Sequence, residues 1–150
     1  MAHSYTNLLY HLVFSTQGRR ALLTPNVRAV LFPYLAGAVR GEGGDAIIVQ
    51  GTADHVHILT HLRQDKALAN VLRDIKANSS KWLHQTFPDQ RSFAWQQGYG
   101  AFTVSASQSD KVRRYIEGQE KHHRRTTFED EFIALLKAHG IDFDSRFIWD

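Results

Sequence analysis

The chain has 150 residues, a net charge of +3 and no cysteine, which excludes disulfides, a thiolate zinc site and a thiol nucleophile. Its length fits one domain, residues 1–150, with a sizeable apolar core. No apolar run approaches the roughly 20 residues of a membrane-spanning helix, and the N-terminus lacks a signal-peptide pattern. We therefore expect a cytoplasmic protein with no membrane partner.

Apolar periodicity divides the first two thirds of the chain into six elements. Period-two and continuous apolar runs predict strands, and apolar residues three or four apart predict helices. The predicted order is strand 5–16, helix 25–40 with a glycine-rich stop at 41–44, strand 45–51, strand 55–62, helix 67–87 and strand 101–105. Thr24 and Pro25 mark the start of the first helix, and Pro33 inside it is expected to kink or divide it.

This order of elements is typical of the ferredoxin-like βαββαβ arrangement, an α+β fold with an antiparallel sheet. In that arrangement the first and third strands are central and both helices pack on one face. The other face is then open, as in sheets that bind nucleic acid. Additional C-terminal helices are predicted over 109–123 and 128–139, and the tail 141–150 is expected to fold back as a clamp or to form a dimer contact.

A pair of histidines, His55 and His57, brackets Val56 on the predicted third strand. Side chains at i and i+2 of a strand lie on the same face, so the two imidazoles project together while Val56 and Ile58 face a core on the other side. Two adjacent neutral imidazoles suit one divalent metal ion, although such a pair without a partner group is more often structural. His11, alone on the first strand, is expected to be a hydrogen-bonded core residue and not a ligand.

Positive charge concentrates in one segment, which holds six basic side chains and two histidines: Lys111, Arg113, Arg114, Lys121, His122, His123, Arg124 and Arg125. Such a block is typical of a protein with a phosphate-rich partner, or of a solvated helix face. Tyr115 and Gln119 lie four residues apart within it and therefore on one face of the predicted helix. A tyrosine hydroxyl can attack phosphorus when a cation neutralises the phosphate oxygens. Tyr115 is thus a candidate nucleophile, the alternative being an ordinary surface tyrosine.

Six ordered segments together carry a family resemblance: residues 10–16, 54–59, 75–82, 93–102, 115–123 and 128–132. Through these segments the chain resembles the single-tyrosine transposases of the insertion-sequence-200-like group. That group belongs to the superfamily named for its His-hydrophobe-His motif. Within the group, the chain resembles the branch associated with repetitive extragenic palindromes.

The resemblance implies a DNA transposase that cleaves and rejoins single-stranded DNA near hairpins through a covalent 5′-phosphotyrosine. It implies Tyr115 as the nucleophile, and His55 and His57 as metal ligands with Gln119 as the third. It also implies that the protein acts as a homodimer. Two histidines alone would favour zinc, whereas the resemblance and the oxygen ligand from Gln119 favour Mg²⁺ or Mn²⁺.

Contacts to DNA are expected from basic residues of the helices 67–87 and 109–123, namely Arg73, Lys76, Lys81, Arg113, Arg114 and Lys121. Trp95 or Tyr99 is a candidate platform for base stacking, and Trp95 fits a core position equally well. Two other functions remain open. One is a non-catalytic or domesticated hairpin-DNA-binding protein on the same fold, and the other is a metal-dependent hydrolase that uses bound water.

Overall fold

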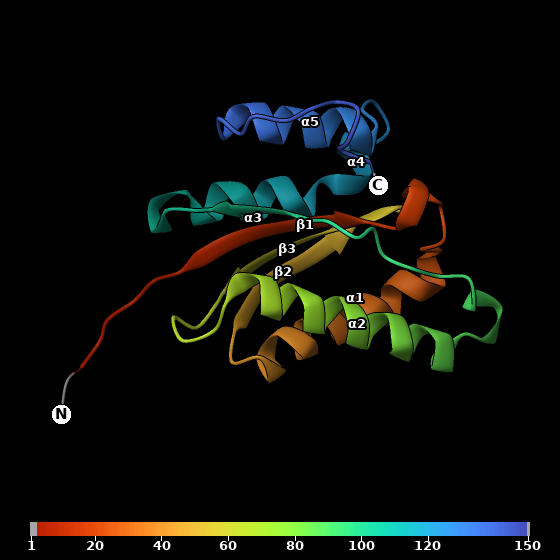
Figure 1. Cartoon of the computed structure of the whole chain (residues 1–150), viewed down its shortest axis with the longest axis horizontal. Helices are drawn as coiled ribbons and strands as arrows, with labels where there is room; N and C mark the ends of the chain where they lie inside the picture. Colours follow the sequence, from red (N-terminus) through yellow and green to blue (C-terminus); the bar gives the residue numbers. More distant parts are fainter. Residues whose placement is uncertain (1–2, 150) are drawn as a thin grey trace.

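The computed structural model describes residues 3–149, and its centre is a four-stranded antiparallel sheet (Figure 1). The strands are β1 (Leu9–Ser15), β2 (Asp45–Gly51), β3 (His55–His61) and β4 (Gly100–Thr103). Their order across the sheet is β2-β3-β1-β4, which places β1 and β3 in the centre. The predicted α+β, ferredoxin-like arrangement is therefore confirmed.

One face of the sheet is covered by α1 (Pro25–Gly41) and α2 (Leu68–Thr86) (Figure 1). Thr24 caps α1, because its side-chain oxygen accepts a hydrogen bond of 3.3 Å from the backbone N–H of Val27. Pro33 lies inside one continuous helix, so the expectation that it might divide the helix is wrong. Because Pro33 is exposed, water can bond the carbonyl group that its missing N–H leaves free.

The main core lies between this helix pair and the sheet. Its buried side chains come from both helices and from alternate residues of the central strands, including Leu12, Phe14, Leu31, Leu35, Val56, Ile58, Leu72 and Ile75. Val56 and Ile58 point into this core, as the period-two pattern predicts. The intervening histidines of β3 therefore face the opposite side of the sheet.

That opposite face is also covered, by α3 (Ser109–Glu117), α4 (Gln119–His122) and α5 (Phe128–Ala138) (Figure 1). Ile116 of α3 packs on Leu9 and Leu59, whereas Phe132 of α5 packs on Val13. The expectation of an open sheet face is therefore wrong, because α3 and α5 each bury an apolar side against it.

The segment predicted as one helix, 109–123, forms two. Gly118 separates α3 from α4, with φ −87° and ψ 16°. Glycine in a helix costs about 1 kcal/mol relative to alanine, so the break falls at the weakest point of the segment. Tyr115 and Gln119 therefore belong to different helices instead of sharing one helix face.

Three short 3-10 turns complete the structure: η1 (Gln17–Arg19), η2 (Pro88–Gln90) and η3 (Ala106–Gln108). The tail after α5 folds back as the predicted clamp, because the Trp149 ring lies 5.6 Å from that of Phe132 and the Arg19 guanidinium lies 4.5 Å from the Trp149 ring centre. The predicted domain and tail extend to Asp150, outside the described residues. Within residues 3–149, no helix combines the length and apolar character needed to cross a membrane.

Gly51 ends β2 at a place where a side chain does not fit. A Cβ there would lie 2.1 Å from the carbonyl oxygen of His55 and 2.9 Å from the Cα of Val56. Because only a backbone movement relieves these contacts, we expect Gly51→Ala to lower the free energy of unfolding by about 2 kcal/mol or more, measured by urea denaturation.

Gly37 provides the matched control for this substitution. A Cβ on Gly37, at an exposed position of α1, would meet nothing within 4 Å. We expect Gly37→Ala to raise the free energy of unfolding by about 0.5–1 kcal/mol, because alanine has the higher helix propensity. A stability unchanged by Gly51→Ala would contradict the close approach of the two strands.

Candidate active site

The two histidines of β3 lie side by side beneath the C-terminal helices. His55 and His57 are fully buried, and their ring centroids are 5.1 Å apart. Nδ1 of His57 lies 2.7 Å from Nε2 of His11, and Nδ1 of His55 lies 2.8 Å from Oδ1 of Asp54. These contacts leave Nε2 of each β3 ring for a group on the helices. His11 is a buried, hydrogen-bonded residue, as predicted.

One carboxylate from α5 occupies the space between the rings. Glu131 is only 3% exposed. Its Oε1 lies 3.0 Å from Nε2 of His57, 3.0 Å from Nε2 of His123 and 3.5 Å from Nε2 of His55. Nε2 of His57 and Nε2 of His123 lie within hydrogen-bond distance of Oε1 and thus supply partners that a buried carboxylate needs.

The second oxygen of the same carboxylate faces α3 and α4. Oε2 of Glu131 accepts a hydrogen bond from the Tyr115 hydroxyl and another, 2.9 Å long, from the side-chain amide of Gln119. Oε1 of Gln119 lies 2.9 Å from Nε2 of His55. The structure therefore brings Tyr115, Gln119, His55 and His57 together around Glu131, within one chain.

The donor atoms in this cluster suit a cation. A metal-binding histidine is neutral, and with Asp54 accepting its one N–H, at Nδ1, Nε2 of His55 would offer a lone pair. That lone pair faces the oxygen of Gln119 and Oε1 of Glu131. Reversing the Gln119 amide would set two oxygens against each other at Glu131. A positive ion between these lone pairs would satisfy all of them.

Four side chains in the described residues form a group that could hold a metal ion: His55, His57, His123 and Glu131. One ligand atom from each lies within 4.8 Å of all the others. Adjacent ligands that lie about 2.1 Å from one ion are about 3.0–3.4 Å apart. The separations of 3.0 to 3.5 Å between Oε1 of Glu131 and the three ring nitrogens match this spacing. The residues present therefore fit a divalent metal.

Burial and pairing set the protonation of the cluster. Burial lowers the pKa of His57 to about 4, although the neighbouring Glu131 opposes the shift. Burial also raises the pKa of the Tyr115 hydroxyl well above its ordinary value, and its hydrogen bond to Glu131 raises it further. Burial alone would raise the pKa of Glu131, but hydrogen bonds from His123 and His57 hold this pKa well below its ordinary range. Near neutral pH, Glu131 is ionised and Tyr115 keeps its proton.

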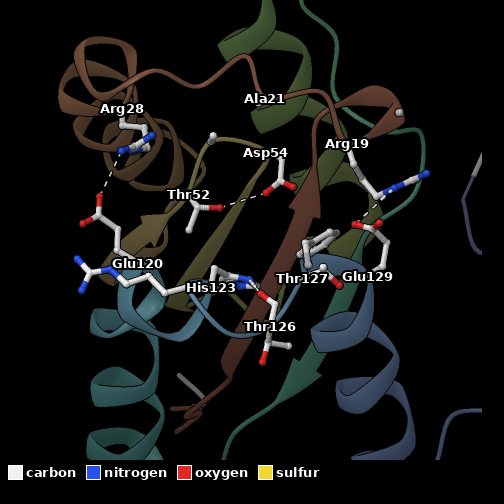
Figure 2. A pocket seen from close by; sticks show the side chains of 14 residues that line it. Arg19, Ala21, Arg28, Thr52, Asp54, Glu120, His123, Thr126, Thr127 and Glu129 are labelled. Carbon is white, nitrogen blue, oxygen red and sulfur yellow. Dashed lines mark hydrogen bonds and ion pairs between the residues drawn. The ribbon is translucent and has the colours of Figure 1, made fainter.

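A cavity of about 740 Å³ reaches the cluster from one side (Figure 2). Asp54 and His123 belong to its wall, and both contact the buried cluster. The pair Arg28–Glu120, at 3.2 Å, also lies in the wall. Three arginines line the cavity: Arg19, Arg28 and Arg124. Three carboxylates line it as well: Asp54, Glu120 and Glu129. Because Arg19 pairs with Glu129 as Arg28 does with Glu120, the cavity gives access to the cluster between charges of both signs.

The basic residues predicted on α2 lie away from this cluster, on the helix layer across the sheet (Figure 1). Arg73 and Lys76 line a second cavity, of about 470 Å³, and Lys81 is exposed. The Lys76 ammonium donates to backbone oxygens of loop 97–98 at 3.1 and 2.8 Å. Burial lowers the pKa of Lys76 to about 8. Lys76 therefore holds a loop in place, in addition to the DNA contact predicted for it.

Of the two aromatic candidates for base stacking, Trp95 is a core residue. It is 7% exposed, its indole N–H donates to Oγ of Ser79 at 2.9 Å, and its ring packs edge-to-face on Phe14. Tyr99 is half-buried and lines the cavity beside α2. Tyr99 is therefore the remaining candidate for a stacking platform.

The other predicted DNA-binding residues lie on α3 and α4. Arg113 pairs with Glu117 at 2.6 Å, whereas Arg114 and Lys121 are exposed. The sheet separates this group from the basic residues of α2 (Figure 1). The six predicted residues therefore form two groups, which would contact different parts of a nucleic acid.

A comparison with known protein families identifies the chain. The family described as "Transposase IS200 like" matches residues 4–119. The chain belongs to this family. The matched region contains the histidines of β3, Tyr115 and Gln119, so the site described above lies largely within the shared part of a DNA transposase. His123 and Glu131 lie beyond it.

Individual relatives agree with the family assignment. The ISDra2 transposase TnpA of Deinococcus radiodurans is 25% identical over 117 residues, which cover 75% of this chain and 84% of the relative. The transposase for insertion sequence element IS200 of Salmonella typhimurium is 26% identical over 125 residues, which cover 79% of this chain and 81% of the relative.

Two solved structures share the fold. One is a crystal structure of a proposed transposase from Deinococcus radiodurans R1, with a TM-score of 0.65 and 22% identity over 79% of this chain and 96% of that one. The other is a REP-associated tyrosine transposase bound to a REP hairpin. It gives a TM-score of 0.52 and 13% identity over 77% of this chain and 67% of that one.

No sequence pattern assigned His123 or Glu131 to the cluster around His55 and His57. His123 lies in the basic segment, and Glu131 lies in an acidic turn, so charge patterns assign both to the surface. A signal was nevertheless present, because Glu131 falls between Phe128 and Phe132 on the apolar side of α5. A carboxylate on an apolar helix face indicates a buried, paired charge.

The buried histidines make the stability of the transposase depend on pH. Burial, together with the neighbouring His57, lowers the pKa of His11 from 6.5 to about 3. As the pH falls below 6.5, the unfolded chain takes up a proton that the folded chain does not bind, so the free energy of unfolding decreases. Replacing His11 with Gln removes this one proton uptake and leaves the other groups in place.

We therefore expect the wild type to lose about 2 kcal/mol more stability than His11→Gln between pH 7 and pH 5. Urea denaturation at the two pH values measures the difference. If both proteins lose the same amount, His11 is not held neutral in the folded state.

Proposed function

We propose that this transposase cleaves and rejoins single-stranded DNA near hairpins through a covalent 5′-phosphotyrosine at Tyr115. In this proposal His55, His57 and Gln119 hold a divalent ion, Mg²⁺ or Mn²⁺. The observation that carries the proposal is the convergence of the Tyr115 hydroxyl and Nε2 of both histidines on one buried carboxylate, Glu131. A REP-associated relative that is bound to a REP hairpin supports hairpin DNA as the partner.

The proposed chemistry is a phosphoryl transfer in two steps. In the first, Oη of Tyr115 bonds to phosphorus, the bond from phosphorus to the 3′ oxygen breaks, and that oxygen takes up a proton from water. The tyrosine proton leaves to solvent and balances the proton that the 3′ oxygen takes up, so Glu131 stays ionised and holds the hydroxyl only until it reacts. In the second step a 3′ hydroxyl loses its proton to solvent and bonds to phosphorus, the bond from phosphorus to Oη of Tyr115 breaks, and Oη takes up a proton from solvent. A bound divalent ion supplies charge neutralisation at the phosphate oxygens.

The nucleophile is tested by incubating the protein with a hairpin-bearing oligonucleotide and Mn²⁺ or Mg²⁺. We expect the wild type to form a covalent protein–DNA adduct, visible as a slower band in a denaturing gel. Tyr115→Phe is expected to form none, because its side chain has no oxygen to attack phosphorus. An adduct that forms with Tyr115→Phe would show that another residue is the nucleophile.

Tyr34 offers a matched control for this substitution. Its hydroxyl donates to the backbone oxygen of Asn78 at 3.3 Å, on the helix layer across the sheet from the site. We expect Tyr34→Phe to keep adduct formation within about twofold of the wild type, since the substitution removes only an exposed hydrogen bond.

The two basic groups are tested by the salt dependence of DNA binding. Each phosphate contact to a single strand contributes about 0.7 to the slope of log K against log salt. We expect the double substitution Arg114→Ala with Lys121→Ala to reduce this slope by about 1.4, and Arg73→Ala with Lys81→Ala to do the same. Lys66, which pairs with Glu42 at 2.8 Å, is the control, and Lys66→Ala should leave the slope unchanged. An unchanged slope for either double variant removes that group from the DNA interface.

A non-catalytic hairpin-binding protein is the second candidate function. One observation favours it: the raised pKa of Tyr115, caused by burial and by Glu131, makes the resting hydroxyl a weak nucleophile. Tight, metal-independent hairpin binding without any adduct would support this function. A metal-dependent hydrolase would instead cleave DNA after Tyr115→Phe and leave no covalent intermediate.

The homodimer is also part of the proposal. Tyr115 and the two histidines meet within one chain, so one copy supplies all the residues placed in the site. The mass of the protein in solution, measured by light scattering with and without hairpin DNA, tests whether two copies act together.

A further inference from the structure

His123 and Glu131 have environments that the shared part of the family does not explain. Both lie beyond the matched residues 4–119, and yet Nε2 of His123 and Oε1 of Glu131 are 3.0 Å apart beside the two histidines of β3. Glu131 is almost completely buried. A helix that only covered the sheet would place an apolar residue there. Because burying a carboxylate costs free energy, we expect Glu131 to have a function beyond packing.

Nδ1 of each of the three imidazoles in the cluster has a polar partner. Nδ1 of His55 faces the Asp54 carboxylate at 2.8 Å, and Nδ1 of His57 faces a ring nitrogen of His11 at 2.7 Å. Nδ1 of His123 donates to the backbone oxygen of Thr126 at 2.6 Å. Metal-binding histidines characteristically hold their non-ligating nitrogen in this way. Nδ1 of His123 is therefore held in place and its Nε2 faces the cluster, as in the two predicted metal-binding histidines.

The two oxygens of Glu131 divide between two sets of partners. Oε1 faces Nε2 of His55, His57 and His123. Oε2 faces the hydroxyl of Tyr115 and the amide of Gln119. One carboxylate therefore joins the imidazole group to the tyrosine.

We propose that Glu131 links the metal site to the nucleophile: Oε1 binds the metal together with Nε2 of His55, His57 and His123, while Oε2 positions the Tyr115 hydroxyl. This inference rests on the proposed function and adds two residues, Glu131 and His123, to its ligand set. Glu131 and His123 are metal ligands, and Glu131 is in addition the positioning residue of Tyr115. Gln119 holds the carboxylate through its amide and keeps its oxygen toward His55.

The ligand set is tested by direct metal binding to the full-length protein without DNA. Mn²⁺ is titrated in, and the electron paramagnetic resonance signal of free Mn²⁺ reports how much is bound. We expect one tightly bound Mn²⁺ in the wild type and a Kd raised by about tenfold or more in both Glu131→Gln and His123→Ala. If both variants bind Mn²⁺ as tightly as the wild type does, the enlarged ligand set is wrong.

Asp130 provides a matched control one residue along the same helix. It is exposed, so Asp130→Asn removes the same charge without touching the cluster. The Kd of Asp130→Asn for Mn²⁺ is expected to stay within about twofold of the wild-type value, because water and salt screen an exposed charge. Thermal unfolding in a chelator checks that each variant is folded. If Glu131→Gln is not folded, His123→Ala still tests the ligand set.

The link to the nucleophile is tested by adduct formation at Mn²⁺ concentrations that saturate each variant. His123 is a ligand only, so His123→Ala should recover to within a few-fold of the wild-type rate. Glu131→Gln should stay at least about tenfold slower, because Tyr115 has lost the carboxylate that positions it. Equal recovery of the two variants would overturn the positioning role of Glu131.

The two measurements also separate this inference from the proposed function. If the wild type forms no adduct but its Mn²⁺ affinity depends on Glu131 and His123, then the proposed function fails and the ligand set stands. If the wild type forms an adduct but Glu131→Gln and His123→Ala bind Mn²⁺ as tightly as the wild type does, then the function stands and the inference fails.

Discussion

The packing of α3, α4 and α5 on the sheet depends on stabilising one buried negative charge, the carboxylate of Glu131. A buried carboxylate without partners costs several kcal/mol, and Glu131 is 3% exposed. Its partners come from three parts of the chain: the histidines of β3, Tyr115 and Gln119 of α3 and α4, and His123 just before α5. These contacts fix α5 against the sheet and against α3 and α4. His123 and Glu131, which follow the family match, are therefore part of the buried cluster.

The site combines two kinds of support. The histidines of β3 lie on a central strand, paired on both sides, and each Nδ1 is held by a neighbour. Their positions are as rigid as the sheet itself. Tyr115 lies on α3, which Gly118 separates from α4, so its position depends on side-chain contacts more than on a continuous helix. Glu131 provides the strongest of these contacts, since a hydrogen bond to a charged group contributes about 1.5–3 kcal/mol.

Local sequence patterns predicted the parts of the structure that depend on local geometry. The period of two in a strand places His55 and His57 on one face, whatever that face contacts. The same patterns predicted α5, but the contact between Glu131 and His57 joins residues 74 apart, which no local period encodes. Gly118 and Pro33 also show that local propensity alone does not decide where a helix ends. The glycine ends a helix, whereas the exposed proline lies within one, because tertiary packing decides how much a weak helical residue matters.

A carboxylate shared between a metal site and a nucleophile would link the two thermodynamically. If a bound ion changes the free energy of the reaction at Tyr115, then the reaction of Tyr115 changes the free energy of ion binding by the same amount. In the proposed reaction, a Tyr115 esterified to DNA would have no proton to donate, and Oε2 of Glu131 would keep only the hydrogen bond from Gln119. Rejoining the DNA would restore the tyrosine hydroxyl and, with it, the second hydrogen bond to the buried carboxylate. The burial of Glu131 would therefore favour completion of strand transfer over persistence of the covalent intermediate.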